Sequence, residues 1–140
     1  MTATHNFTTT SGNTMRVALI KAQSSQTGTY NATTTSYTTI TGNSDELANG
    51  NGYTTKGNAL TNVTPTNGST TATTALTDFA DTSWTSATFT TRGCVIYNDS
   101  ATGDPAIMVI DFGADYSVAG GTFTIQFPTA DESNAILRIT

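Results

Sequence analysis

The abundance of threonine is the feature that most constrains the fold of this chain. Threonine occupies 34 of the 140 positions, and its branched Cβ loses freedom in a helix but packs well on a pleated strand. No stretch places apolar residues at the i, i+3, i+4 and i+7 spacing of an amphipathic helix. Short apolar runs separated by turn residues are typical of an all-β domain. The sequence therefore predicts a single-domain antiparallel β-sandwich of the jelly-roll kind.

The strand signals of the first half are short. Met15–Ala22 is an apolar run of strand length, and Tyr37–Ile40 is read as a second, shorter strand. Leu60–Thr64 and Ser69–Leu76 flank Asn67-Gly68, a dipeptide that accepts the positive φ angles of a tight turn. These two segments are therefore predicted to form a hairpin. Because the intervening stretches are Thr-, Ser- and Asn-rich, disorder over residues 23–75 is an alternative.

The second half carries clearer patterns. Its expected strands are Ala87–Tyr97, Ala106–Phe112, Thr122–Phe127 and Asn134–Ile139. Strict alternation in the first of these predicts that Phe89 shares a face with Val95 and Tyr97. The second is apolar on both faces, as in a central strand, and the third alternates Phe and Ile with polar residues. A Gly-rich connection through Ala119-Gly120-Gly121 is expected to separate the second from the third.

Two short segments match protein-kinase motifs. Asp111-Phe112-Gly113 matches the magnesium-binding tripeptide, and Val17–Lys21 matches the lysine strand. Kinase chemistry also needs a Gly-rich phosphate loop, a catalytic-loop His-Arg-Asp and two lobes. The only histidine is His5, and no Gly-rich loop precedes Val17. The Asp-Phe-Gly is therefore interpreted as the point where a strand leaves the core.

Other catalytic groupings are equally incomplete. Cys94 has no histidine other than His5 to act as its base, so it is interpreted as a small core residue rather than a reactive thiol. The carboxylates available for glycoside hydrolysis are Asp78, Asp81, Asp111 and Asp115. Nothing in their spacing selects a pair. The sequence therefore predicts no enzyme, no catalytic residue and no cofactor.

One loop offers oxygen ligands of the kind that calcium prefers. The segment Asn98–Asp104 carries Asp99 and Asp104 with hydroxyls and carbonyls between them. The spacing differs from that of an EF-hand, whose acidic residues recur at alternate positions and end in Glu. A polar hairpin loop with Gly103 and Pro105 as turn residues is the preferred interpretation, and no metal site is predicted.

Charge and hydropathy exclude several partners. The chain carries five basic and ten acidic residues, a net charge of −5, and only 11% charged residues. Scattered basic residues argue against a nucleic-acid surface. No apolar run approaches the ~20 residues of a membrane span, and the start has no signal-peptide pattern. A soluble protein folded in a reducing cytosol is expected, with a weakly charged surface that partners cover.

The expected domain organisation is an extended N-terminal arm, residues 1–14, followed by a β-sandwich domain, residues 15–140. The arm is either frayed or orders on a neighbouring subunit with Phe7 as its anchor. Trp84, the only tryptophan, is either a core anchor or a binding aromatic. Phe7, Tyr53 and Trp84 are therefore the candidate partner-contact residues.

The second half also resembles a known family. WTSATFTTRGCVIYND, residues 84–99, followed by VIDFGADYSVAGGTFTIQF, residues 109–127, resembles a family of small virion proteins of tailed bacteriophages, including cyanophages. RVALIKA and ANGNGYTTKGNALTNVT, residues 48–64, fit the same pattern. The resemblance covers about residues 15–127 and consists of strands and turns rather than a catalytic motif. It implies a structural protein of the head or tail, often a minor capsid protein of the decoration (cement) type.

The function implied by this resemblance is that of a capsid decoration protein. Such a protein binds the major capsid protein in the assembled head and stabilises the shell, because a ligand that prefers the assembled state shifts the equilibrium towards it. A homotrimer on the capsid surface of the virion, assembled in the bacterial host cytoplasm, is expected, since capsid lattices offer threefold positions. The alternative is a tail or fibre module that binds host-surface glycans through Trp84, Tyr53 and the Asn/Asp loops.

Overall fold

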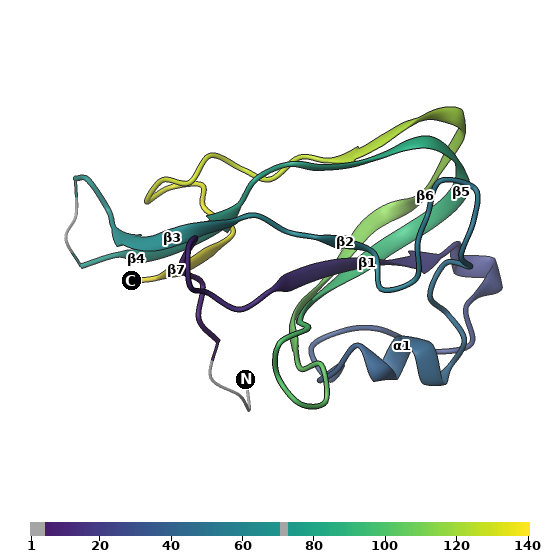
Figure 1. Cartoon of the computed structure of the whole chain (residues 1–140), viewed down its shortest axis with the longest axis horizontal. Coiled ribbons are helices and arrows are strands. Elements are labelled where there is room, and N and C mark those ends of the chain that lie inside the picture. The colour runs from purple at the N-terminus through teal and green to yellow at the C-terminus, as the bar shows by residue number, and fades with distance from the viewer. Residues whose placement is uncertain (1–4, 71–72) are drawn as a thin grey trace.

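Two antiparallel sheets make up the fold (Figure 1). The computed structural model describes residues 5–70 and 73–140. The strands are β1 Met15–Lys21, β2 Asn58–Ala59, β3 Asn62–Asn67, β4 Ala75–Phe79, β5 Thr82–Asn98, β6 Ala106–Ile125 and β7 Leu137–Ile139. The helical elements are the 3₁₀ turn η1 Gln23–Ser25 and the short helix α1 Thr38–Gly42. One sheet has the order β2-β1-β5-β6 and the other β3-β4-β7.

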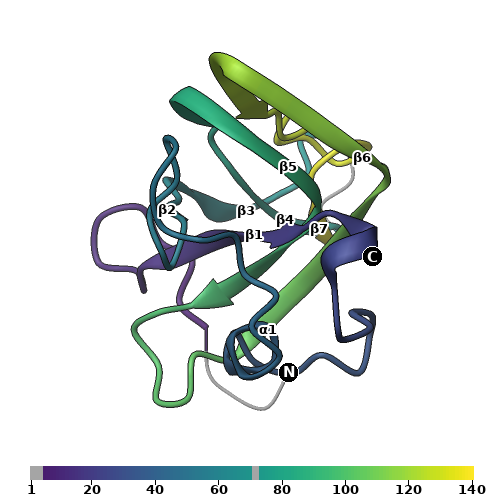
Figure 2. The same ribbon diagram turned by 90° about the vertical axis from the view of Figure 1, so that its right-hand side faces the viewer.

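The four-stranded sheet is covered on both faces. On one face, Val17 and Leu19 of β1 share a core with Phe79 of β4 and with Trp84. This core joins the two sheets, so the prediction of an all-β sandwich is confirmed. On the other face, side chains of β1 and β5 pack beneath α1, where Ile40 is fully buried. Figure 2 shows this layering, with α1 on one side of β1 and part of the β5–β6 hairpin on the other.

A bend in the long β5–β6 hairpin folds it over β1 (Figures 1 and 2). Gly93 pairs with Asp111, whereas Thr91 pairs with Tyr116, so residues 112–115 of β6 bulge opposite a single residue of β5. A Cβ on Gly93 would lie 2.4 Å from the carbonyl oxygen of Ile110, which only glycine avoids. A bulge of this kind bends the strand and increases its twist.

The same bend corrects two predictions. The structure has one strand, Ala106–Ile125, where two strands joined at Ala119-Gly120-Gly121 were expected. Gly121 pairs in the ladder and Gly120 is a single-residue bulge within it, whereas the larger interruption lies nearer the Asp-Phe-Gly. Phe89 packs on the same core as Trp84, on the opposite side of the sheet from Val95. The irregularity between Thr91 and Gly93 reverses the alternation that the sequence pattern assumed.

Several predictions about single strands and turns can be compared directly with the structure. Met15–Ala22 is confirmed as a strand, β1, and the antiparallel hairpin of β3 and β4 is confirmed around Asn67-Gly68. The turn of this hairpin is longer than expected and includes residues 71–72, which lie outside the described residues. Tyr37–Ile40 is not a strand, because Tyr37 and Ile40 lie three residues apart on one face of a helical turn and both enter the core beneath β5. The last predicted strand is confirmed over Leu137–Ile139.

The N-terminal segment is not extended over its described part, residues 5–14. The Asn13 amide donates to the Asn6 carbonyl oxygen at 2.8 Å, and the Asn6 amide donates to Asn13 Oδ1 at 2.9 Å. These bonds close a loop that places the ring of Phe7 6.2 Å from that of Phe79. The anchor expected on a neighbour is thus packed on the chain's own core, while residues 1–4 lie outside the described residues.

No helix within residues 5–70 and 73–140 has the length and apolar character needed to cross a membrane.

Candidate functional site

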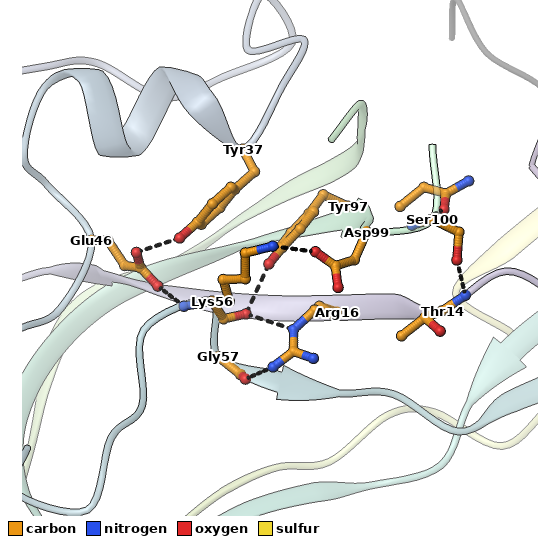
Figure 3. A network of polar contacts seen from close by, with 10 residues as sticks. Thr14, Arg16, Tyr37, Glu46, Lys56, Gly57, Tyr97, Asp99 and Ser100 are labelled. Carbon is orange, nitrogen blue, oxygen red and sulfur yellow. Dashed lines mark hydrogen bonds and ion pairs between the residues drawn. The ribbon is translucent and has the colours of Figure 1, made fainter. Parts of the chain in front are cut away.

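A buried carboxylate, Glu46, lies at one end of the polar network in Figure 3. Its Oε2 accepts a hydrogen bond of 2.6 Å from the Tyr37 hydroxyl. Its Oε1 accepts from the Tyr53 hydroxyl at 2.8 Å and from the backbone amide of Lys56 at 2.6 Å. Only 9% of Glu46 is exposed, so these three donors replace the water that burial removes.

The network continues through the backbone of Lys56 to the strands. The Lys56 carbonyl oxygen accepts from Arg16 Nε at 3.2 Å and from the Tyr97 hydroxyl at 3.0 Å. The carbonyl of Gly57 accepts from Arg16 Nη2 at 2.6 Å. The Lys56 ammonium group itself pairs with Asp99 at 2.8 Å (Figure 3). The loop before β2 is therefore fastened to both β1 and β5.

Burial keeps the two tyrosine hydroxyls of this network protonated. Burial, together with the charge of Glu46, raises the pKa of the Tyr53 hydroxyl well above its usual range. Burial and the hydrogen bond to Glu46 raise the pKa of Tyr37 in the same direction. Both hydroxyls therefore remain protonated at physiological pH and donate to the side-chain oxygens of Glu46. Because these hydroxyls and the Glu46 side chain are hydrogen-bonded to one another, they hold the loops in place.

Asp45, the neighbour of Glu46, fastens a second loop. Its carboxylate accepts hydrogen bonds from the amides of Thr27 and Gly28, each at 2.8 Å, and from the Tyr30 hydroxyl at 2.5 Å. Burial opposes ionisation of Asp45, but these donors outweigh it and lower its pKa. Burial and the bond to Asp45 raise the pKa of Tyr30 to about 12. Sequence reasoning did not identify the Asp45-Glu46 pair, whose side-chain partners are 7 to 18 residues away.

The aromatic residues predicted as partner contacts lie in the core. Trp84 is 3% exposed and Tyr53 is 2% exposed, and their rings stack with centroids 6.3 Å apart. Phe7 packs against Phe79, as described above. The interpretations of Trp84 and Tyr53 as surface contacts are therefore wrong, because the sandwich encloses both side chains. Phe7 is partly buried against the same core, and its role as a partner contact stays a prediction. The alternative interpretation of Trp84 as a core anchor is confirmed.

Three further sequence interpretations can be compared with the structure. Cys94 is fully buried, and burial raises the pKa of its thiol to about 12, as expected for a small core residue. The loop after Asn98 is a hairpin turn, in which Gly103 and Asp104 have φ angles of +83° and +47°. Asp111 pairs with Arg92 at 2.7 Å, and this contact lowers the pKa of the carboxyl group. Among the described residues, no three His, Cys, Asp or Glu side chains gather as a metal site would require.

The outer edge of β6 is the part of the sheet that is open to a partner. β6 is the last strand of its sheet and pairs with β5 on one side only. Near its start, the Ala106 amide donates to the Thr35 carbonyl oxygen at 2.9 Å. Beyond that point, within the described residues, no backbone group of another element bonds the outer edge of β6. Residues 107–111 and 116–125, on either side of the bulge, therefore keep an edge on which about every second residue can offer main-chain hydrogen bonds.

A groove of about 420 Å³ lies where the two halves of β6 face each other. Its apolar lining includes Ile110, Phe112, Tyr116, Phe123, Ile125 and Phe127. Tyr116 is 52% exposed, which is unusual for a large side chain in this protein. The bulge at residues 112–115 creates the groove, because it turns the second half of the strand back over the first. Sequence reasoning missed the groove, since only the bend brings these residues together.

His5 is fixed in a neutral form by its neighbours. Asn98 Oδ1 accepts from the Ser100 amide at 3.0 Å, which orients the Asn98 side chain. Its Nδ2 then donates to Asn13 Oδ1 and to His5 Nδ1, each at 3.1 Å. The His5 Nδ1 must therefore be an unprotonated acceptor.

We expect the N-terminal loop to open as the pH falls. Burial lowers the pKa of His5 from its ordinary value of 6.5, so its contribution to stability is complete above about pH 6.5 and is lost as the pH falls through the lower folded-state value. The hydrogen-exchange protection factors of residues 5–14, which correct for the pH dependence of intrinsic exchange, should therefore fall at acidic pH. His5→Gln can keep the acceptor without titrating near neutrality and should remove the pH dependence. Identical profiles for the two proteins would contradict the assignment.

The chain matches no protein-family model, no curated protein and no solved structure. Its function is therefore argued from the two features described above. The Asp45 and Glu46 networks are enclosed and join parts of the same chain. The β6 edge with its groove is open and is the candidate site for another molecule.

Proposed function

We propose that this chain is a structural protein of a phage virion, a capsid decoration protein that binds the assembled head and stabilises it. The observation that carries this proposal is the uncovered edge of β6 beside an apolar groove. Soluble proteins normally protect long strand edges with Lys, Pro or short strands, because bare edges pair with other chains. β6 is 20 residues long, and Asp111 and Asp115 are its only charged residues. Such an edge suits a protein that works while bound to a partner.

The rest of the molecule supports a role in assembly. Only 11% of the residues are charged and the net charge is −5, which suits a surface covered by protein and held away from packaged DNA. The Asp45 and Glu46 networks fix the loops to the strands. A rigid body that prefers the assembled shell stabilises that shell by linkage.

The resemblance to phage virion proteins points the same way. Its two segments, residues 84–99 and 109–127, fold into β5 and β6, the hairpin that carries the edge and the groove. The alternative, a glycan-binding tail module, relied on the Asn/Asp loops and on the rings of Trp84 and Tyr53. Both side chains are buried, so they cannot stack on a sugar without unfolding the core. The head is therefore the proposed location.

In this proposal the chain acts without catalysis. It binds the major capsid protein on the outer surface of the head, and it does so as a homotrimer at threefold positions of the lattice. Residues 5–14 do not reach across to a neighbour, because Phe7 is packed on the chain's own core. The contact to the shell is assigned instead to the β6 edge.

The experiment is reconstitution on heads of the phage that encodes the chain. Recombinant protein should bind expanded, genome-free heads at regular lattice positions in cryo-electron microscopy and should raise the temperature at which the shells disassemble. Heads of an unrelated phage serve as the control and should not bind. A virion that carries the chain only in its tail, or heads whose disassembly temperature is unchanged by saturating protein, would refute the proposal.

A further inference from the structure

We infer that the edge of β6 binds an extended strand of a partner chain, whose large apolar side chains enter the groove and whose basic residues face the acidic residues of β6. This inference deepens the proposed function and rests on it only for the identity of the partner. Recognition by strand addition has two parts: main-chain hydrogen bonds supply affinity, and pockets for alternate side chains supply specificity.

The first part is supplied by the free edge. The ladder between β5 and β6 runs from Thr82↔Ile125 to Tyr97↔Ala106, so one side of β6 faces β5 along its whole length, with interruptions at the bulges. An added strand would lie about 4.8 Å from β6 on the other side. The residues of β6 beyond Asp111 include no proline and no basic residue, and residues 107–111 and 116–125, on either side of the bulge, can each pair with an added strand.

The second part is supplied by the groove. Phe123 and Ile125 point into it from the second half of β6, and Ile110 and Phe112 point into it from the first half. The ring of Phe112 contacts those of Tyr116 and Phe123, at centroid distances of 6.1 and 6.2 Å. The volume of the groove, about 420 Å³, falls within the ~300–1,000 Å³ range of ligand pockets. Alternate apolar side chains of an added strand can therefore be buried there.

The charges on β6 indicate which kind of strand its edge binds. The charged side chains of β6 are both acidic, and Arg92 is already paired with Asp111. Asp115 accepts a hydrogen bond from the Gln23 amide at 3.0 Å and has no ion pair with a described Lys or Arg. A second copy would bring two more acidic residues to the same edge and a net charge of −5 to each side. Because like charges on adjacent strands are destabilising, a neutral or basic strand fits better than a second copy.

The inference is tested with a defined peptide on a soluble carrier. The probe alternates apolar and polar residues between basic ends, with the sequence KTFTITFK. It should bind the wild-type protein saturably and protect amides of residues 107–125 from hydrogen exchange. The version with glutamate at both ends should bind about tenfold or more weakly, because charge complementarity is lost. Absence of saturable binding by the basic probe, equal binding of the two versions, or protection elsewhere in the chain would overturn the inference.

A matched pair of variants separates the groove from general charge effects. Tyr116→Lys changes an exposed groove residue and repels the basic probe, so binding should be lost. Thr41→Lys makes the same charge change at an exposed position of α1, on the other side of β1, and should bind as the wild type does. Equal binding by both variants would overturn the inference. If the protein binds heads but not the peptide probe, only this inference is refuted. If it binds the probe but not heads, only the proposed function is refuted.

Discussion

Glu46→Ala is expected to lower the free energy of unfolding by about 3–5 kcal/mol, since each buried donor left without an acceptor costs roughly 1–3 kcal/mol. The substitution leaves three donors without their acceptor: the hydroxyls of Tyr37 and Tyr53 and the amide of Lys56. It also frees the loop that Lys56 joins to Arg16. Urea denaturation followed by circular dichroism measures the change, with an unaltered m-value showing that the same surface is exposed.

Glu46→Gln is the matched control for this prediction. The amide side chain keeps the size of glutamate and one of its acceptor oxygens, and its NH₂ group can donate to the tyrosine hydroxyl that lost an acceptor. A loss of about 1–2 kcal/mol is expected, as for one weakened hydrogen bond to a charged group. If the alanine variant proves as stable as the glutamine variant, water replaces the carboxylate without cost and the network does not hold the loops.

Features set by neighbouring residues could be predicted from the sequence. The alternation of Phe123, Ile125 and Phe127 depends on the two-residue period of a strand, and β6 keeps that period there. β1 and the β3–β4 hairpin were predicted from equally local signals. Phe89 was assigned to the wrong face, because a bulge inserts residues without changing composition or hydropathy. Strand content is therefore readable from this sequence, whereas the bend that makes the groove is not.

Neither the Glu46 network nor the β6 edge could be predicted from a local pattern. Glu46 lies in a polar loop, and its partners Tyr37 and Tyr53 come from segments with no periodic pattern. One signal was available: in a chain with only 15 charged residues among 140, two adjacent acidic residues near several tyrosines indicate buried, hydrogen-bonded carboxylates. No sequence signal indicated that β6 lies at the edge of its sheet, because whether a strand is central or at an edge depends on the order of strands in the sheet. The apolar run at Ala106–Phe112 suggested a central strand and proved to belong to an edge.

Gly57→Ala is expected to be the most disruptive single methyl addition in this fold. A Cβ at this position would lie 1.8 Å from the carbonyl oxygen of Val17, well inside van der Waals contact, and φ is +67°. Both the backbone conformation and the close approach to β1 therefore require glycine. The loop must move away from β1, which breaks the bond between the Gly57 carbonyl and Arg16. We expect a loss of about 4 kcal/mol or more, which is exceptional for a point substitution.

Gly120→Ala separates the two causes, because Gly120 has nearly the same φ, +66°, and a Cβ there would meet nothing within 4 Å. Its cost should be only that of the left-handed conformation, about 1–2 kcal/mol. Both variants can be followed through the fluorescence of Trp84, the only tryptophan, whose ring lies 6.3 Å from that of Tyr53. Equal losses for the two variants would mean that the loop before β2 does not pack tightly on β1. A large loss for Gly57→Ala alone would show that the contact between Gly57 and Val17 determines where the loop lies, and with it the position of Lys56 beneath Glu46.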